Sequence, residues 1–359
     1  MNWNTDLCAC LGIEVPIIQA GMAGGITSPE MVAEVSNAGG LGTLGAAYMK
    51  PDAIRNAIKE IRSKTDKPFA VNLFVTTQDN EFERLAEVQN VLDPMREKFG
   101  IRVATDYSNE DLFEGQIAVI FEEEVPIIST AFGSLPEKYV NLAKSRGQKI
   151  ITMVTTVEEA IQAEQAGADV IVAQGSEAGG HRGTFDIKKH PDGANVGSFA
   201  LIPQVVDAVD IPVVAAGGIM DGRGLVAAFA LGAEGIQMGT RFLTALESTA
   251  HPAYKEALIH HDETSTKLTK VFSGRPARGI RNAFMEPFEQ SGIEPLPFPS
   301  QNTVTNDIRA AAKKESDPAY MSLWGGQGLR LVKEGQSTSQ IIAEVLEAAE
   351  KLVNARFRR

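Results

Sequence analysis

The sequence predicts an α/β protein built as a (β/α)8 TIM-type barrel, with a smaller, mainly helical insertion near the barrel mouth. Eight short runs of apolar residues alternate with stretches of helical periodicity. The runs are continuous in hydrophobicity instead of alternating with polar residues, which is typical of parallel strands covered by helices. In addition, a unit of helix, Gly-Ala-acid and strand occurs twice, at 167–169 and 232–234. This weak internal repeat is of the α/β type.

The eight predicted strands span residues 15–19, 41–44, 69–75, 125–129, 149–154, 169–173, 212–216 and 235–239. Their number fits one closed barrel, whose usual length is about 250 residues. A doubly wound open sheet is the alternative, because strands are easily miscounted from one sequence.

Several helices are marked by their own ends. Thr27-Ser28-Pro29-Glu30 offers a capping hydroxyl, a proline in the first turn and an early acid, and Gly39 ends the helix. A second helix follows Pro51-Asp52. At the C-terminus, residues 337–354 form an amphipathic pattern, and we expect this helix to complete the outer ring of the barrel.

Residues 246–320 interrupt the rhythm of strands and helices. They contain helical pieces, few strand signals and the run EPLPFPS at 294–300. The sequence therefore predicts a barrel formed by residues 1–245 and 321–359, with an inserted substrate-side subdomain at 246–320. A homodimer formed through this insertion is a hypothesis about the oligomeric state.

Composition narrows the class of partner. The chain has 359 residues, and 34 basic against 46 acidic residues give a net charge of −12, which argues against nucleic acid or an anionic membrane as the main partner. No apolar run is long enough for a membrane span. The start MNWNTDLCAC lacks the basic and apolar regions of a secretion signal.

Two cysteines cannot form a disulfide framework, so we expect a reduced, cytoplasmic protein. Cys8 and Cys10 have no nearby His or Cys to complete a metal site, and no metal is predicted.

Glycine-rich turns follow three of the predicted strands, at the end of a barrel where active sites lie. The first strand ends in the turn 19–25 (QAGMAGG), which is either a plain tight turn or a close approach to a flat ligand. The seventh and eighth strands end in Gly217-Gly218 and in Gln237-Met238-Gly239-Thr240. Loops after these two strands frequently hold a phosphate on backbone N–H groups, with a hydroxyl such as that of Thr240 available to donate. The chain has neither a Walker-type loop nor a GxGxxG turn after a strand.

The sixth strand is followed by QGSEAGGHRG, residues 174–183. His181 comes after two glycines that let an imidazole project over a ligand, and its ordinary pKa suits proton abstraction near neutral pH. The other four histidines lie in charged or polar surroundings. His181 is therefore the candidate catalytic residue.

Two polar residues in apolar strands and one aromatic turn complete the candidates. Asn72 and Gln174 must find hydrogen-bond partners if buried, and each either fixes a loop or binds the edge of a heteroaromatic ring. Trp324 lies among glycines in LWGGQG, residues 323–328, where it either packs in the core or caps a ligand.

The sequence resembles the nitronate monooxygenase family, formerly called 2-nitropropane dioxygenases. The matching stretches are AGMAGG (20–25), VNLFV (71–75), QGSEAGGHRG (174–183), AAGGI (215–219), QMGTRF (237–242) and LWGGQG (323–328). They occur in order over nearly the whole chain, and the glycine-histidine stretch is the most specific of them.

The resemblance implies FMN bound in the barrel, with His181 as the base beside its reactive face. The cofactor-binding residues would be Met22, Ala23, Asn72, Gln174, Gly179, Gly217, Gly218, Gln237, Met238, Gly239 and Thr240. Arg182, Trp324 and Gln327 would lie on the substrate side, with Arg182 or another cation helping to hold an anionic substrate. The implied reaction is oxidation of alkyl nitronates such as propionate 3-nitronate by O2, giving oxo compounds and nitrite, with detoxification as the expected role.

Three alternatives stay open at this stage. Flavin-dependent enoyl-acyl-carrier-protein reductases share the barrel and much of the glycine-histidine stretch but use NAD(P)H. Barrels similar to inosine monophosphate dehydrogenase need a catalytic cysteine in a mouth loop, whereas both cysteines here precede the first strand. A non-catalytic flavin- or phosphate-binding barrel would have little use for His181.

Overall fold

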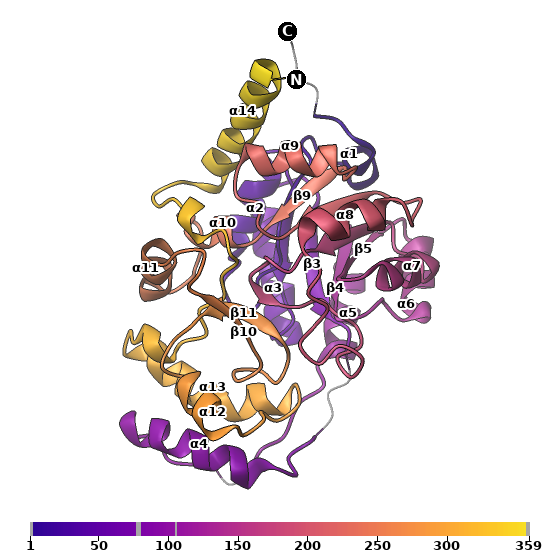
Figure 1. Cartoon of the computed structure of the whole chain (residues 1–359). Helices are drawn as coiled ribbons and strands as arrows, with labels where there is room; N and C mark the ends of the chain where they lie inside the picture. Colours follow the sequence, from indigo (N-terminus) through magenta and orange to yellow (C-terminus); the bar gives the residue numbers. More distant parts are fainter. Residues whose placement is uncertain (1–2, 77–79, 105, 357–359) are drawn as a thin grey trace.

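The eight parallel strands form a closed (β/α)8 barrel (Figure 1). The computed structural model describes residues 3–76, 80–104 and 106–356. The strands are β1 Ile17–Gln19, β2 Gly42–Gly45, β3 Phe69–Phe74, β4 Ile127–Ala131, β5 Lys149–Val154, β6 Val170–Gln174, β8 Val213–Ala216 and β9 Gly235–Met238. They follow the order β1-β9-β8-β6-β5-β4-β3-β2. Closure comes from Leu41, just before β2, whose N–H donates to Ile17 O and whose carbonyl accepts from Gln19 N–H, both at 2.9 Å. The predicted barrel is confirmed, and the open-sheet alternative is wrong.

The barrel interior explains why the strand sequences are apolar throughout. Ile127, Val172 and Val214 belong to a buried cluster inside the barrel, while Ile171 and Ile236 pack outward against the helices. Because both faces of every strand are covered, the usual alternation of apolar and polar residues is absent.

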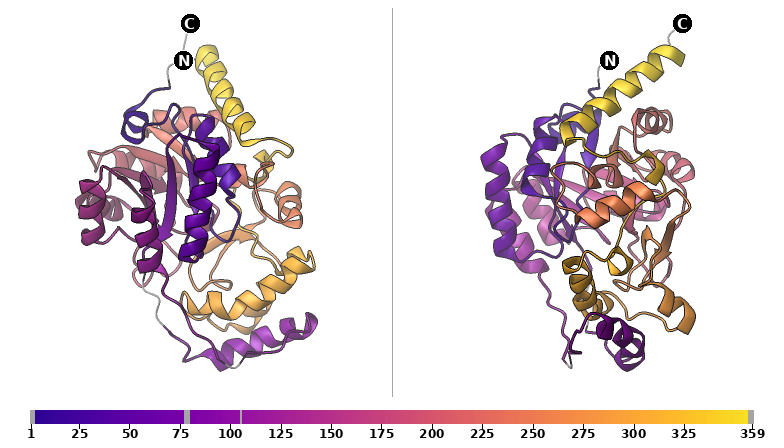
Figure 2. Two further views of the ribbon diagram at one scale, coloured as in Figure 1. Left: turned by 180° about the vertical axis from the view of Figure 1, so that it is seen from behind. Right: turned by 90° about the vertical axis from the view of Figure 1, so that its left-hand side faces the viewer.

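A ring of helices surrounds the strands. These helices are α2 Pro29–Asn37, α3 Pro51–Lys64, α5 Phe113–Glu122, α6 Glu137–Ser145, α7 Val157–Gln165, α8 Ser198–Val206, α9 Gly222–Ala230, α10 Thr240–Leu243 and α14 Thr338–Arg356. The N-terminal helix α1, Asp6–Leu11, instead packs Leu7 and Leu11 into the interior cluster. The N-cap of α2 is Ser28, whose Oγ accepts from Met31 N–H at 3.0 Å. The C-terminal helix α14 packs against α9 and α2, so it completes the ring as expected (Figures 1 and 2).

A second body covers the mouth of the barrel. It contains α11 Pro252–His260, β10 Thr266–Thr269, β11 Ala277–Ile280, α12 Glu286–Ser291, α13 Ser300–Lys314, and the short helices η1 Pro318–Tyr320 and η2 Leu329–Leu331. A helix from the β3–β4 connection, α4 Leu85–Lys98, lies with α12 and α13 at one end of the molecule (Figures 1 and 2). Buried Arg96 of α4 donates from Nε to Asp307 of α13 at 2.7 Å. The helical cluster is therefore built from two separate stretches of chain, α4 and the segment that contains α12 and α13. The division of the chain at 246 and 320 stays a prediction.

A small antiparallel sheet joins the inserted segment to the barrel loops. Strand β11 pairs with β10 and with β7, Gly180–His181, and Ala277 lies opposite His181. Few strand signals are visible in this part of the sequence, because the strands are short. Through this pairing the inserted segment fixes the backbone of the candidate catalytic residue.

Candidate active site

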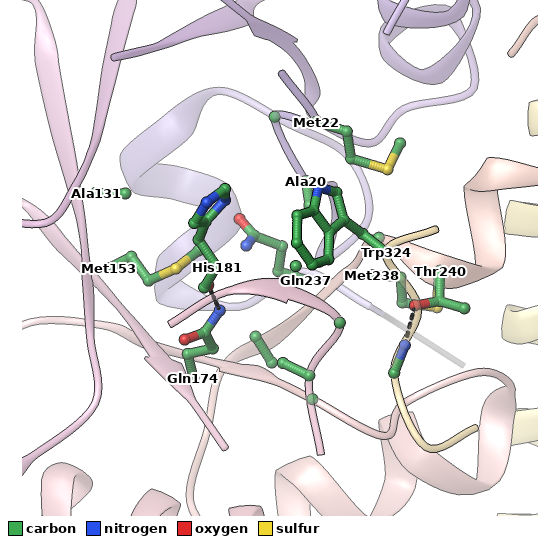
Figure 3. A pocket seen from close by; sticks show the side chains of 18 of the residues that line it. Ala20, Met22, Ala131, Met153, Gln174, His181, Gln237, Met238, Thr240 and Trp324 are labelled. Atoms are coloured by element: carbon green, nitrogen blue, oxygen red, sulfur yellow. Dashed lines mark hydrogen bonds between the residues drawn. The ribbon is translucent and has the colours of Figure 1, made fainter. Parts of the chain in front are cut away.

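A cavity opens at the carboxyl ends of the barrel strands and encloses about 1270 Å³ of empty space, including its mouth (Figure 3). Twelve cofactor-side and catalytic residues predicted from the sequence line its wall. They are Met22, Ala23, Asn72, Gln174, Gly179, His181, Gly217, Gly218, Gln237, Met238, Gly239 and Thr240. Trp324 lines the same cavity, so the structure brings together segments from one end of the chain to the other.

The turns after β8 and β9 form a cradle suited to an anion. Gly217 and Gly218 have φ of 109° and 69°, a region that favours glycine. Their N–H groups have no hydrogen-bond partner within residues 3–76, 80–104 and 106–356. Across the cavity wall, Thr240 Oγ1 accepts from Gly326 N–H at 3.0 Å, which leaves the hydroxyl proton available. These free donors fit a phosphate group at this end of the cavity.

Three side-chain amides line the cavity and differ in their partners. Gln237 is only 8% exposed, and its amide makes no hydrogen bond to another described residue, so it is left free for a ligand. Asn72 Nδ2 donates to Ser129 Oγ at 3.0 Å. In contrast, Gln174 uses both ends of its amide: Nε2 donates to His181 O at 3.0 Å and Oε1 accepts from Gly183 N–H at 2.8 Å. Gln174 therefore fixes the His181 segment.

The imidazole of His181 is half-buried in an aromatic enclosure. Its ring centroid lies 5.4 Å from that of Trp324 and 5.8 Å from that of Phe132. Burial, reinforced by the nearby positive charges of Arg275 and Arg309, lowers the pKa of His181 to about 3. The ring is therefore neutral at physiological pH, with a nitrogen lone pair able to accept a proton.

Two residues predicted on the substrate side are not brought to the cavity. Arg182 is fully buried, and its guanidinium donates to the carbonyls of Gly175, Gln174 and Ala194 at 2.7–3.1 Å. It directly follows β7, Gly180–His181, and its side chain turns toward the loop backbone, so the expected role of holding substrate is corrected. Gln327 is exposed, and only its glycine neighbours line the cavity.

Several polar residues around His181 are not among those predicted from the sequence. Ser273 Oγ lies 2.8 Å from His181 Nε2, and Arg275 stacks on Phe132 with its guanidinium carbon 3.8 Å from the ring centroid. Tyr48 and Tyr254 also line the cavity. One clue was available in Ser273-Gly274-Arg275: Gly274 has φ of 84°, and a Cβ there would lie 2.4 Å from Leu296 O. A glycine beside two polar residues can mark such a tight turn, but nothing in the sequence places the turn beside His181.

The closed barrel, the anion cradle and the half-buried histidine define a (β/α)8-barrel enzyme whose cavity is suited to a phosphate-bearing cofactor. The family described as nitronate monooxygenase matches residues 4–348, and the chain belongs to this family. Membership makes it an oxidoreductase acting on a small molecule, and it implies a flavin cofactor. The cradle and the free Gln237 amide are compatible with such a group. No helix of the described residues is long and apolar enough to cross a membrane.

Named relatives cover almost the entire chain. It is 44% identical over 356 residues to a probable nitronate monooxygenase of Staphylococcus saprophyticus, covering 99% of this chain and all of the relative. It is 45% identical over 332 residues to a probable nitronate monooxygenase of Staphylococcus aureus, covering 92% and 93% of the two chains.

Solved structures are also similar to this chain over nearly its full length. Nitroalkane oxidase from Streptomyces ansochromogenes superposes with a TM-score of 0.91 at 36% identity, covering 98% of this chain and 99% of that one. FabK from Thermotoga maritima superposes with a TM-score of 0.78 at 35% identity, covering 98% of each chain.

Proposed function

We propose that the protein is an FMN-dependent nitronate monooxygenase, which oxidises alkyl nitronates such as propionate 3-nitronate with O2 to oxo compounds and nitrite. The observation that carries the proposal is the neutral imidazole of His181 at the wall of the cofactor-sized cavity, beside Arg275 and Arg309. Family membership and the nitroalkane oxidase neighbour support this reaction class.

The cradle residues would hold FMN by its phosphate. The N–H groups of Gly217 and Gly218 and the Thr240 hydroxyl would donate to phosphate oxygens, while Gln237 would bind the polar edge of the ring. A flavin held there would supply electron transfer between the nitronate and oxygen. The protein supplies position, a partly dry pocket and positive charge.

His181 would act on the substrate as a proton acceptor. A neutral nitroalkane must lose a proton from the carbon that bears the nitro group, and a neutral imidazole can take it. The product is an anion, whose charge would be stabilised by the arginines near His181 and would in turn raise the pKa of the ring. A substrate supplied as the nitronate needs no such step.

The test is anaerobic mixing of the FMN-loaded protein with propionate 3-nitronate, and separately with NADH and NADPH, while the flavin absorbance is followed. Rapid change with the nitronate alone, followed by turnover and nitrite release in air, is the expected result. No response to the nitronate would overturn the proposal.

The second candidate is a flavin-dependent enoyl-acyl-carrier-protein reductase. It is favoured by one observation, the full-length similarity to FabK at 35% identity. Bleaching by a reduced nicotinamide, without any response to nitronate, would assign the protein to this class. We further propose that the enzyme detoxifies nitronates in the cytoplasm, which is consistent with its two free cysteines.

A further inference from the structure

A second cavity continues outward from His181 toward the body that covers the barrel mouth. It encloses about 1960 Å³ of empty space with its mouth, and it shares Tyr48, Phe74, His181, Tyr254 and Trp324 with the first cavity. Whatever reacts beside His181 can therefore extend into this space. The residues on its far wall decide what kind of tail fits.

Helix α13 forms that far wall with a polar stripe. Asn302, Asn306, Arg309 and Lys313 recur at helical spacing and line the cavity. The opposite side of α13 is apolar, with Val304 and Ile308 buried in the core of the covering body. The amphipathic pattern of α13 thus places the polar stripe, with the two cations Arg309 and Lys313, at the wall of the second cavity.

Arg309 is held in place and yet keeps hydrogen-bonding capacity. Its Nη2 donates to the carbonyl and to Oδ1 of Asn302, at 2.7 and 2.9 Å. It forms no ion pair with a carboxylate of the described residues, and Nη1 has no partner among them. The nearby Asp307 instead pairs with Arg96. Its Nε also donates to Thr305 O at 3.4 Å. A guanidinium fixed on its own helix and unpaired in charge is prepared to bind an anion.

We propose that Arg309, assisted by Lys313, forms a subsite for a carboxylate at the far end of the substrate. This inference rests on the proposed function and makes it more specific: the preferred nitronates carry a second negative charge, which α13 recognises while His181 faces the reacting carbon. The one carboxylate that lines this cavity within the described chain is the exposed Glu110, so the wall is cationic on balance. Arg309 is a specificity residue. It would hold the anionic substrate, which is the role expected of Arg182 from the sequence.

The test compares two nitronates that differ in their tails, propionate 3-nitronate and the uncharged propyl 1-nitronate. In Arg309→Met, kcat/KM for the carboxylated substrate should fall by about 10- to 100-fold, the size expected for one charge-assisted hydrogen bond. The value for propyl nitronate should change less than about 3-fold. Arg309→Lys should recover part of the loss, and Lys313→Met should give a smaller selective loss. Lys314→Met is the matched control, because Lys314 is exposed on α13 and does not line the cavity.

The remaining outcomes overturn the subsite. Equal losses with both nitronates would mean that Arg309 acts on the reacting group or on folding, and no loss with either would remove it from recognition. If Arg309→Met changed only the reduction of the flavin by NADH or NADPH, the anion that Arg309 binds would be a dinucleotide phosphate instead of a substrate carboxylate.

A binding measurement separates failure of this subsite from failure of the proposed function. Succinate has the carboxylated tail with a second carboxylate in place of the nitronate, and butyrate lacks the tail charge. In the FMN-loaded protein, succinate should perturb the flavin spectrum with a Kd at least about 10-fold lower than that of butyrate, and Arg309→Met should abolish the difference. This result would support the subsite even if no nitronate is turned over. Equal binding of the two acids to the unaltered protein would reject it.

Discussion

The Nε2 atom of His181 lies 2.8 Å from the Oγ atom of Ser273, which joins the loop after β6 to the inserted segment. Ser273 Oγ also lies within hydrogen-bond distance of the carbonyl and the N–H of Arg275. Because one imidazole nitrogen is occupied by this contact, the other, Nδ1, has no hydrogen-bond partner among the described residues and is left for a ligand. The residue that orients the candidate base thus comes from a part of the chain that contributes no barrel strand.

Replacing His181 by Asn should separate the two kinds of substrate. Oxidation of neutral nitroalkanes should fall by about 10²- to 10⁴-fold, because a general base is lost. Preformed nitronates should be affected far less. Steady-state kinetics with nitroethane and with ethyl nitronate measure this, and His260→Asn, at an exposed position, is the control. Equal losses for both substrates would remove the assignment of His181 as base.

Ser273→Ala should weaken the positioning of the imidazole without removing it. We expect kcat for neutral nitroalkanes to fall by about 10-fold, the size of one hydrogen bond, while KM changes little. Ser273→Thr keeps the hydroxyl and should retain most of the activity. Should the alanine variant match the native pH profile and kcat, Ser273 would have no part in orienting His181.

The depressed pKa of His181 predicts a pH dependence of stability. The folded ring, with its pKa lowered to about 3, stays neutral where the unfolded ring, with a pKa of about 6.5, takes up a proton. Unfolding therefore binds a proton between these values, and the free energy of unfolding falls as the pH drops from about 6.5 toward 3. Urea unfolding at pH 7.5 and 5, at fixed FMN, should show a larger loss in the native protein than in His181→Asn. An equal loss in both would contradict the low pKa.

Substitutions in the cradle should separate cofactor binding from folding. A Cβ at Gly239 would meet only Ala20 Cβ at 3.6 Å and Met22 Sδ at 3.8 Å, and both of these residues line the cavity. Gly239→Ala should therefore fold normally but raise the Kd for FMN by about 10-fold or more through crowding of the phosphate. Gly217→Ala forces a side chain to φ of 109° and should also lower the free energy of unfolding by about 1–3 kcal/mol. Flavin fluorescence and thermal unfolding distinguish these effects, and unchanged FMN affinity in Gly239→Ala would place the phosphate elsewhere.

Arg182→Met should act on stability instead of on substrate choice. Removal of the guanidinium takes one donor from each of three buried carbonyl groups, and we expect the free energy of unfolding to fall by about 2–4 kcal/mol. The ratio of kcat/KM for carboxylated and uncharged nitronates should stay the same at a temperature where the variant is folded. Arg223→Met, at an exposed position, is the control. A changed ratio would return Arg182 to substrate binding.

The sequence by itself determined the barrel and the residues that line the first cavity. Continuous apolar runs such as 169–173 required burial on both faces, and glycines such as Gly217 and Gly218 marked turns where only a free backbone fits. Because parallel strands place all their carboxyl ends at one edge, strand positions alone were enough to gather Asn72, Gln237 and His181 at one cavity.

Only the tertiary structure decided which distant side chains surround His181. Arg182 is adjacent to His181 in sequence yet turns into the loop backbone, whereas Ser273, Arg275 and Arg309 come to the cavity or its rim through β11 and α13. The inserted segment reaches the barrel mouth because α4, α12 and α13 pack together. This packing has no signature in the sequence next to His181, so the sequence did not predict these contacts. Local periodicity fixes elements and their ends, while the meeting of distant side chains depends on how those elements pack.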